Sequence, residues 1–378
     1  MRLRACGNYD MRIAMIGQKG IPATWGGVER HVEELGQRLV ELGHDVVVFT
    51  RPNYTDVSVT EYKGMRLISL PTIGTKHLDA IMHSMLATLY CWRHMVDVVH
   101  YHAIGPAVLA PLARLRRRAT VATIHGQDWK RQKWGPLASL ALRGAEQVAL
   151  RIPHATICVS ESLSEQYEED GLRTEYIPNG VSIDDGDDVS VLQEFGIEDG
   201  GYILFAGRLV PEKGLHYLIE AHRVTGTKKQ LVVAGDSSNT DGYVGEVRST
   251  SGPGVVYTGY QYGAKLAALF RHAALFVLPS DLEGLPIVLL EAASYGVPIL
   301  ASDIAPNVEI LGEKCRYFRA GDVASLAQAL EACLESLERL RSEAEVLKAR
   351  AIRDYDWDVV AMAVQEVYQR IHKSRTSR

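Results

Sequence analysis

Two basic residues in a short glycine-bounded segment form a candidate anion site. Arg208 and Lys213 lie between Gly207 and Gly214, directly after the apolar run Tyr202–Ala206. A guanidinium group can bind two phosphate oxygens at once, and an ammonium group adds a compact positive charge. Each side chain alone fits an ordinary exposed surface as well, so a phosphate-binding role depends on the neighbouring segments.

Two glutamates eight residues apart form a second candidate group. Glu283 and Glu291 follow the apolar run Leu275–Leu278, and carboxylates are suitable acceptors for the hydroxyl groups of a sugar or a ribose. The neighbours of Glu291 in the sequence are mostly apolar, and a carboxylate in such a setting needs a polar partner. Pro286 lies between the two glutamates and is expected at the first position of a helix, where its missing amide is tolerated.

The residues around this proline predict a helix N-terminus that suits an anion. The amides of Ile287 and Val288 would lie in the first helical turn, where they have no partner within the helix and can bind a diphosphate. Because Pro286 has no amide to donate, further backbone contacts would come from Gly284 and Leu285 just before it.

A third group of candidates lies in the first half of the chain. The glycine-rich loop at 17–27 joins an apolar run to a helical segment, and glycines allow backbone amides to approach a phosphate closely. The loop has neither a P-loop ending nor a G-x-G-x-x-G fingerprint, so a tight turn fits it as well as a phosphate site. His125 ends the apolar run at 120–124. A single histidine is usually structural, but the carboxyl end of a parallel strand favours a functional one.

Apolar runs that alternate with helical patterns position all of these residues. Such alternation predicts parallel, doubly wound α/β sheets. In the first half we expect strands at 11–16, 46–49, 66–70, 96–100, 120–124 and 156–159 and helices at 28–42, 77–95, 105–116 and 136–151. In the second half we expect strands at 202–206, 230–234, 255–258, 275–278 and 298–301, a helical stretch at 323–353 and a final helix at 358–372.

The length of 378 residues is typical of two domains. The segment Ile177-Pro178-Asn179-Gly180 and the acidic stretch after it have the composition of a linker. We therefore predict an N-terminal Rossmann-like domain at 11–180, a C-terminal one at 181–354 and a last helix, 355–378, that returns to the N-terminal domain. The ligand site is expected in a cleft across which the two sheets face each other. Residues 1–10 are expected to precede the fold.

Composition excludes several classes of protein. Apolar residues make up 47% and charged residues 23% of the chain, as in ordinary globular proteins. A net charge of −5 argues against nucleic-acid binding. Five scattered cysteines without a C-x-x-C pair argue against disulfides or structural zinc and favour a reducing compartment. We expect no signal peptide, and no apolar run approaches the roughly 20 residues that span a bilayer.

Taken together, the motifs resemble those of the retaining glycosyltransferases of family four, the bacterial group 1 type, which have the GT-B fold. The resemblance covers nearly the whole chain from Met11 and depends on Arg208 and Lys213 in combination with Glu283 and Glu291. Three further segments resemble a rhamnosyltransferase-like subgroup of surface polysaccharide synthesis: Gly20-Ile21-Pro22-Ala23, Gly26-Gly27-Val28-Glu29 and His125-Gly126-Gln127-Asp128-Trp129.

The resemblance implies a role for each candidate residue. Arg208 and Lys213 would neutralise the diphosphate of a nucleotide-sugar donor, and Glu283 would hold the transferred sugar. Glu291 would bind the ribose, and His125 would contact the donor sugar near the reacting carbon. The other implied donor-binding residues are Gly26, Gly27, Gly207, Tyr260, Gln261, Gly284, Leu285, Ile287 and Val288, with Tyr260 and Gln261 in the segment that contacts the base mainly through its backbone.

The sequence departs from many relatives at Gly284-Leu285-Pro286, where they have an aromatic residue and a second glycine. This departure changes which backbone amides meet the donor, but it leaves both glutamates in place. The chain has no D-x-D motif in a suitable loop. Cations and helix amides can stabilise a leaving diphosphate without a metal, so we expect neither a metal nor another cofactor.

The predicted function is transfer of a sugar, rhamnose or another hexose, from a nucleotide-diphosphate sugar to a glycan or lipid-linked acceptor, with retained anomeric configuration. A GT-B nucleotide-sugar epimerase and a non-catalytic nucleotide-sugar-binding paralogue are the alternatives. A dehydrogenase is disfavoured because the G-x-G-x-x-G fingerprint is missing. The donor sugar and base, the acceptor and the linkage stay open.

A cytoplasmic location, with peripheral contact at the inner membrane face, is also expected. Each basic residue near an anionic surface contributes about 1 kcal/mol of attraction, and the first half is rich in them. They are Arg114, Arg116, Arg117, Arg118, Lys130, Arg131 and Lys133. The apolar residues of the helix expected at 77–95 fit a membrane-facing surface or, more simply, the protein core.

Overall fold

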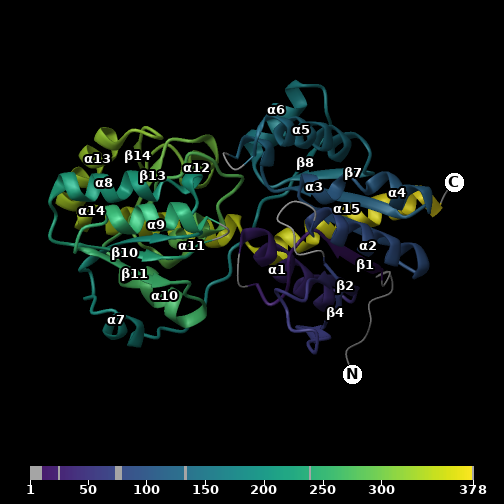
Figure 1. Ribbon diagram of the computed structural model, residues 1–378, viewed down its shortest axis with the longest axis horizontal. Helices are drawn as coiled ribbons and strands as arrows, with labels where there is room; N and C mark the ends of the chain where they lie inside the picture. Colours follow the sequence, from purple (N-terminus) through teal and green to yellow (C-terminus); the bar gives the residue numbers. More distant parts are fainter. Residues whose placement is uncertain (1–10, 24–25, 73–78, 132–133, 238–239, 377–378) are drawn as a thin grey trace. The chain divides into compact units, whose positions relative to one another are not determined.

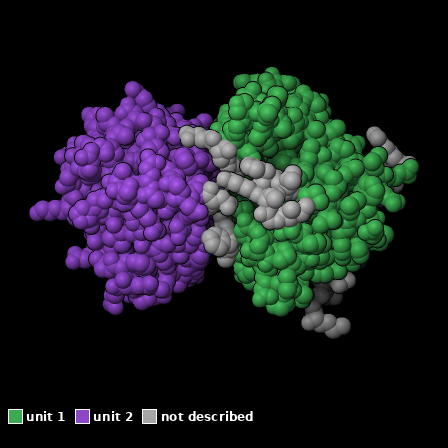
Figure 2. All heavy atoms as spheres, viewed as in Figure 1, with its two compact units in different colours: residues 1–179, 357–378 green, residues 180–356 purple. Residues whose placement is uncertain are grey.

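The computed structural model describes residues 11–23, 26–72, 79–131, 134–237 and 240–376. The chain divides into two compact units, coloured separately in Figure 2. Unit 1 comprises 1–179 and 357–378, and unit 2 comprises 180–356. The chain therefore leaves unit 1 after Asn179 and returns to it at Trp357, one residue before and two residues after the boundaries expected from the sequence.

Unit 1 is built on a sheet with the strand order β3-β4-β2-β1-β5-β6-β7-β8. Every neighbouring pair is parallel except β3 with β4. The strand order reverses between β1 and β5, and the carboxyl ends of two such strands form the usual ligand-binding edge of a doubly wound sheet. The strands are β1 (Arg12–Ile16), β2 (Asp45–Thr50), β3 (Glu61–Tyr62), β4 (Met65–Ser69), β5 (Val98–His102), β6 (Ala119–Ile124), β7 (Ala155–Cys158) and β8 (Glu175–Tyr176).

Helices cover both faces of this sheet because its central strands are buried on both sides (Figure 1). α1 (Gly27–Glu41) and α15 (Trp357–Thr376) pack together on one face. The other face carries α2 (Asp79–Arg93), α3 (Ile104–Ala107), α4 (Ala110–Leu115) and α5 (Pro136–Arg151). α6 (Glu161–Glu169) follows β7, and a 3₁₀ turn, η1 (Asp128–Lys130), follows β6.

Unit 2 is an all-parallel sheet with the order β11-β10-β9-β12-β13-β14. This is the order of a dinucleotide-binding Rossmann sheet, and the reversal lies between β9 and β12. The strands are β9 (Tyr202–Ala206), β10 (Gln230–Ala234), β11 (Val255–Gly259), β12 (Leu275–Leu278), β13 (Ile299–Ser302) and β14 (Arg316–Phe318). Both units therefore have the doubly wound α/β architecture predicted from the sequence.

The helices of unit 2 also pack on both sheet faces. α8 (Leu215–Thr225), α9 (Asp241–Thr250) and α13 (Val323–Glu335) bury apolar side chains against one face. On the other, Phe270 of α10 (Gly263–Arg271) lies with its ring 5.4 Å from Phe276 of β12 and 5.5 Å from Tyr295 of α11 (Ile287–Tyr295). The remaining elements are α7 (Ser190–Glu194), η2 (Pro211–Lys213), α12 (Ala305–Leu311) and α14 (Leu337–Asp354).

Two stretches that were each expected to be continuously helical are divided into two helices. The stretch at 105–116 is split into α3 and α4, with Pro111 in the first turn of α4, because proline is tolerated at a helix start but not in its interior. The stretch at 323–353 is interrupted at Ser336, between α13 and α14. Strands β3, β8 and β14 were not predicted because two or three residues are too short for a period-two pattern.

Candidate active site

In unit 2 the carboxyl ends of β9 and β12 bring the segment 207–214 and the first glutamate together. Gly214 has φ +69°, and a Cβ atom there would lie 1.9 Å from the carbonyl oxygen of Pro279. Only glycine allows this approach. The amide of Asp281 donates a hydrogen bond to the carbonyl of Glu212 at 2.9 Å, which joins the two loops at the point where the strand order reverses.

Lys213 and Glu283 form a largely buried ion pair at this point. Lys213 Nζ donates to Glu283 Oε1 at 2.5 Å, and the hydroxyl of Ser280 donates to the same oxygen at 2.6 Å. The two charged side chains are only 14% and 8% exposed, so each charge depends on the other for compensation. The lysine expected at a diphosphate and the glutamate expected at a sugar are thus in direct contact.

Arg208 follows β9 on the same edge and is partly exposed. Within the described part of the chain it has no ion-pair partner, so its positive charge is available to an anion. Burial raises the pKa of Tyr260, and the positive charge of Arg208 acts in the opposite direction. The Tyr260 hydroxyl donates to the carbonyl of Asp236 at 3.0 Å, and Gln261 Nε2 donates to that of Thr258 at 2.8 Å.

α11 begins at Ile287, with Pro286 as its N-cap residue rather than as its first helical residue. The amides of Leu289 and Leu290 bond to the Pro286 carbonyl at 3.0 and 3.3 Å. Ile287 and Val288 therefore supply the first amides of the helix, as expected for an anion site.

The other predicted residues of unit 2 lie around this helix start. Gly207 has φ +149° and directly follows β9, and its amide bonds to the Ala234 carbonyl of β10 at 2.9 Å. Leu285 is buried, while Gly284 before it is partly exposed. Glu291 is half-buried in the second turn of α11, near Tyr295. The structure therefore places the residues predicted in the second half on one edge of one sheet.

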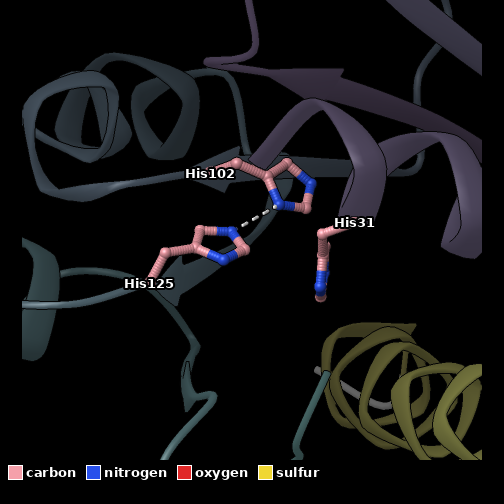
Figure 3. A group of neighbouring side chains, drawn as sticks. All are labelled: His31, His102 and His125. Atoms are coloured by element: carbon pink, nitrogen blue, oxygen red, sulfur yellow. Dashed lines mark hydrogen bonds between the residues drawn. The ribbon is translucent and has the colours of Figure 1, made fainter. Parts of the chain in front are cut away.

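In unit 1 the corresponding strand ends carry histidines, shown in Figure 3. His102 ends β5, His125 follows β6, and His31 reaches them from α1. Nδ1 of His102 lies 3.4 Å from Nε2 of His125. The His31 ring stands edge-on to that of His125, with 4.7 Å between the centroids. The ring of His100 in β5 is tilted by 36° to that of His102, with 4.1 Å between the centroids.

Hydrogen bonds to neighbouring side chains fix the rings of His31 and His100. Nδ1 of His31 donates to Oδ1 of Asn179 at 2.8 Å. His100 uses both nitrogens, with the Tyr368 hydroxyl at 2.6 Å and the Thr123 hydroxyl at 2.7 Å. Among the described residues, Nε2 of His31 and Nε2 of His102 are buried and have no hydrogen-bond partner.

These histidines are neutral at physiological pH. Burial lowers the pKa of His31 to about 4, against a weaker opposing effect of the bond to Asn179. Burial, reinforced by the other histidines, also holds the pKa values of His100, His102 and His125 well below the ordinary range. A neutral imidazole can accept or donate a hydrogen bond, so His125 suits contact with uncharged sugar hydroxyls.

The glycine-rich loop after β1 is held by carboxylates of α1. Glu29 accepts the amide of Lys19 at 3.0 Å, and Glu33 accepts that of Ala23 at 2.7 Å. These two amides therefore bond within the fold and are not available to a phosphate. Gly26 is the N-cap residue of α1, and Gly27 begins that helix, so the two glycines lie at a helix N-terminus.

Sequence reasoning missed His31, His102 and Asn179 as parts of this arrangement. The strand predicted at 96–100 is in fact Val98–His102. Because of this two-residue shift, His102 was not recognised as the last residue of a strand, a position similar to that of His125 directly after β6. His31 lies in a helix that was identified only by its apolar face. The repeated occurrence of histidine at neighbouring strand ends was the available signal.

The basic residues of unit 1 do not form one surface. Arg114, Arg116, Arg117 and Arg118 precede β6, whereas Lys130 and Arg131 follow it, so a strand about 20 Å long separates them. Arg114 and Arg118 bond to backbone carbonyls of neighbouring elements, and Arg131 pairs with Asp128 at 3.0 Å. Lys133 lies outside the described residues.

The helix expected at 77–95 packs on the sheet as α2, whose most exposed large apolar side chain, Met82, is only 37% exposed. The core-facing interpretation of that helix therefore holds. Among the helices of the described chain, none is long and apolar enough to cross a membrane.

Comparisons with known proteins identify the family of this chain. One family model, described as Glycosyltransferase Family 4, matches residues 25–185, and another, described as Glycosyl transferases group 1, matches residues 200–336. A glycogen synthase of Mycobacterium tuberculosis is 30% identical over 95% of this chain and 94% of its own length. A phosphatidyl-myo-inositol mannosyltransferase of Mycobacterium leprae is 31% identical over 96% of this chain and 98% of its own.

Solved structures share the two-unit fold. Sucrose-phosphate synthase from Thermosynechococcus elongatus has a TM-score of 0.81 at 21% identity, covering 96% of this chain and all of that one (100%). Anabaena HepE in complex with UDP and glucose has a TM-score of 0.79 at 19% identity, covering 95% and 99% of the two chains. The predicted GT-B fold class is confirmed by these matches.

Proposed function

The chain belongs to the family 4, or group 1, glycosyltransferases, and on that premise we propose that it transfers a hexose, with retained anomeric configuration, from a nucleoside-diphosphate sugar to a glycan or lipid-linked acceptor in surface polysaccharide synthesis. HepE was solved in complex with UDP-glucose, which supports a nucleoside-diphosphate hexose as the donor class. The segments at 20–23 and 26–29 support rhamnose as a sugar to test beside glucose.

One observation carries the proposal: Arg208, the Lys213–Glu283 pair and the first amides of α11 meet at the strand-order reversal of unit 2. As the bond to the sugar breaks, negative charge develops on the leaving diphosphate. A guanidinium, an ammonium and two helix amides in fixed positions stabilise that charge without reorganisation. The ion pair with Glu283 fixes Lys213 Nζ at this edge.

For the remaining residues we propose the roles that the family resemblance implies. Glu283 holds hydroxyls of the transferred sugar, and Glu291 binds the ribose. Tyr260 and Gln261 use their side chains within the fold, so their backbone is the part that meets the base. In unit 1, the neutral His125 contacts the sugar. We expect transfer to proceed without a metal.

A donor screen followed by a product assay tests this function. Thermal stability is measured with UDP-, GDP-, ADP- and dTDP-linked sugars, and the donor that binds most tightly gives the largest increase at a fixed concentration. The product formed on a lipid-linked acceptor is then analysed by NMR for its anomeric configuration. Donor turnover without acceptor would indicate an epimerase, inversion would contradict the retaining mechanism, and binding without turnover would indicate a non-catalytic paralogue.

We also propose a cytoplasmic location with reversible contact at the inner membrane face. α5 presents Leu137 and Leu140 to solvent, 84% and 67% exposed. Next to them, Arg143 and Lys130 lie 4.2 and 5.3 Å from the ring centroid of Trp129. Exposed leucines beside basic and aromatic side chains suit the interface of an anionic bilayer.

Flotation with anionic liposomes tests the membrane contact. We expect binding that weakens as salt rises, and a clear loss of binding for Leu137→Glu with Leu140→Glu. The matched control is Arg116→Glu with Arg117→Glu, at the other end of β6, which should float like the unaltered protein. The opposite ranking would place the contact at the amino edge of the sheet, and no flotation at low salt would remove it.

A further inference from the structure

We propose that His31, His102 and His125 form a binding site for a divalent transition metal such as Zn²⁺. One ring nitrogen from each of the three lies within 4.8 Å of the other two. Figure 3 shows the side chains converging from α1, β5 and the loop after β6. Three histidines and one open position are a common ligand set for zinc.

The spacing of the first two ligands already fits a tetrahedral metal. Zinc–nitrogen bonds of about 2.0–2.1 Å place two tetrahedral ligand atoms about 3.3–3.4 Å apart. Nδ1 of His102 and Nε2 of His125 are 3.4 Å apart. In the metal-free protein one of the two rings donates a proton to the other, and metal binding requires the donor ring to carry that proton on its far nitrogen instead.

The third ligand is oriented by a hydrogen bond behind it. Oδ1 of Asn179 can only accept, so Nδ1 of His31 carries the proton of the bond at 2.8 Å. The lone pair is then on Nε2, which is buried and has no hydrogen-bond partner among the described residues. A histidine that donates its other N–H to a carbonyl oxygen is the usual arrangement around protein-bound zinc.

The fold uses the neighbouring histidine differently, which makes it a control. His100 is equally buried and its ring contacts that of His102, but both of its nitrogens are bonded, to Tyr368 and to Thr123. It has no lone pair left for a metal. His125 is partly exposed, unlike His31 and His102, so solvent reaches the site through it, and water or another small ligand fills the open position.

Metal at this site would inhibit transfer, an effect that rests on the proposed function. Coordination fixes the ring of His125, which can then no longer adjust to the donor sugar, and a bound cation adds positive charge where a neutral imidazole belongs. We expect Zn²⁺ to reduce turnover reversibly, with activity restored by a chelator. The metal is therefore a regulator of the site and takes no part in the transfer chemistry.

The binding test uses the full chain without a polyhistidine tag, titrated with Co²⁺ and followed by the visible absorption of tetrahedral cobalt. We expect one equivalent to bind with this signature, and Zn²⁺ to displace it. His31→Gln and His102→Gln should abolish the signature, whereas His100→Asn should keep it. Asn179→Ala leaves all three ligands in place and should weaken binding about 10–100-fold, which keeps the test decisive if a histidine variant fails to fold.

Failure of the metal site, of the proposed function and of the regulatory role can be told apart. No tetrahedral signature in the folded wild-type protein, or equal binding by a folded His31→Gln variant, would overturn the metal site whatever the activity. Metal binding by a protein that transfers no sugar would leave the site standing and count against the proposed function. Inhibition by Zn²⁺ that persists in folded His31→Gln would show that the metal acts elsewhere and would overturn the regulatory role.

Discussion

The two units have the same strand-order reversal and place different chemistry at it. In unit 2 the carboxyl ends of β9 and β12 carry Arg208 and the Lys213–Glu283 pair. In unit 1 the ends of β5 and β6 carry His102 and His125, both held neutral by burial. One fold thus provides a charged edge and an uncharged edge, each made from residues that directly follow buried strands.

This difference separates two ways of maintaining a polar site in an apolar sheet. The charged edge depends on exact compensation, because removal of one partner leaves the other charge buried. The neutral edge depends on pH, because protonation of any one imidazole would bring an uncompensated charge into the core. Variants of the charged pair measure the first dependence, and acid unfolding measures the second.

The largest effect is expected at the ion pair of unit 2. Lys213→Met should reduce turnover by about 10²–10³-fold, the cost of losing one oriented charge at the leaving group. It should also reduce the free energy of unfolding by about 3–5 kcal/mol, because Glu283 would remain buried and uncompensated. Steady-state kinetics and urea unfolding measure the two losses.

A double variant separates charge compensation from catalysis. Lys213→Met combined with Glu283→Gln removes both charges, so most of the lost stability should return while turnover stays low. Recovery of turnover together with stability would mean that the pair is structural and that catalysis uses other groups. Lys265→Met is the control, since its ion pair with Glu194 lies on the surface of the same unit and should contribute about 0–1 kcal/mol.

Arg208 should show the kinetic loss without the loss of stability. No carboxylate within the described residues depends on it, so Arg208→Ala should reduce turnover by about 10²-fold or more and leave the urea midpoint unchanged. A loss of stability as large as that of Lys213→Met would indicate that the charge of Arg208 is also paired with a carboxylate in the folded protein. Thermal shifts with the donor should shrink in parallel with turnover.

Much of the charged edge was predictable from the sequence because its parts are local. The strands of unit 2 are buried apolar runs of four or five residues, and Arg208 and Glu283 stand in the loops that directly follow two of them. The contact between Lys213 and Glu283 was not predictable, since it joins positions 70 residues apart through the close approach of two loops. Spacing identifies the strands but not which side chains meet between them.

The neutral edge was largely hidden for a related reason. His31 comes from a helix, His102 from a strand whose end was placed two residues early, and Asn179 from the linker. Their pattern exists only after α1 packs on the sheet. Histidine has no strong preference for a position in a helix or strand, so single-sequence periodicity carries no signal for such a cluster.

Acid should destabilise unit 1 more than unit 2. Burial, and then the charge of Arg51, lower the pKa of His83 to about 4, whereas the unfolded value is about 6.5. Between these values the unfolded chain binds the extra proton, so stability falls as pH falls through that window. His83 alone should account for about 2–3 kcal/mol between pH 7.5 and 4.5.

Tryptophan fluorescence isolates this effect, because all five tryptophans belong to unit 1. The urea midpoint followed by fluorescence should fall steeply below pH 6.5, and His83→Gln should reduce that slope. In unit 2, burial lowers the pKa of His272, but the neighbouring Asp199 and Asp187 outweigh it and raise that pKa overall. His272 therefore stabilises the folded state as pH falls. A fluorescence midpoint that is constant down to pH 4.5 would contradict the comparison.

The smallest expected effect concerns how α15 supports the neutral edge. The Tyr368 hydroxyl bonds to His100 at 2.6 Å, so Tyr368→Phe removes that partner and leaves a buried ring nitrogen unpaired, at a cost of about 1–3 kcal/mol. Tyr202→Phe is the matched change in unit 2, where the hydroxyl bonds to the Leu269 carbonyl at 2.7 Å. If the units unfold independently, the fluorescence midpoint should move for Tyr368→Phe and stay for Tyr202→Phe, while far-ultraviolet circular dichroism should detect both. Equal shifts of the fluorescence midpoint would mean that the two edges, different as they are in chemistry, belong to one cooperative unit.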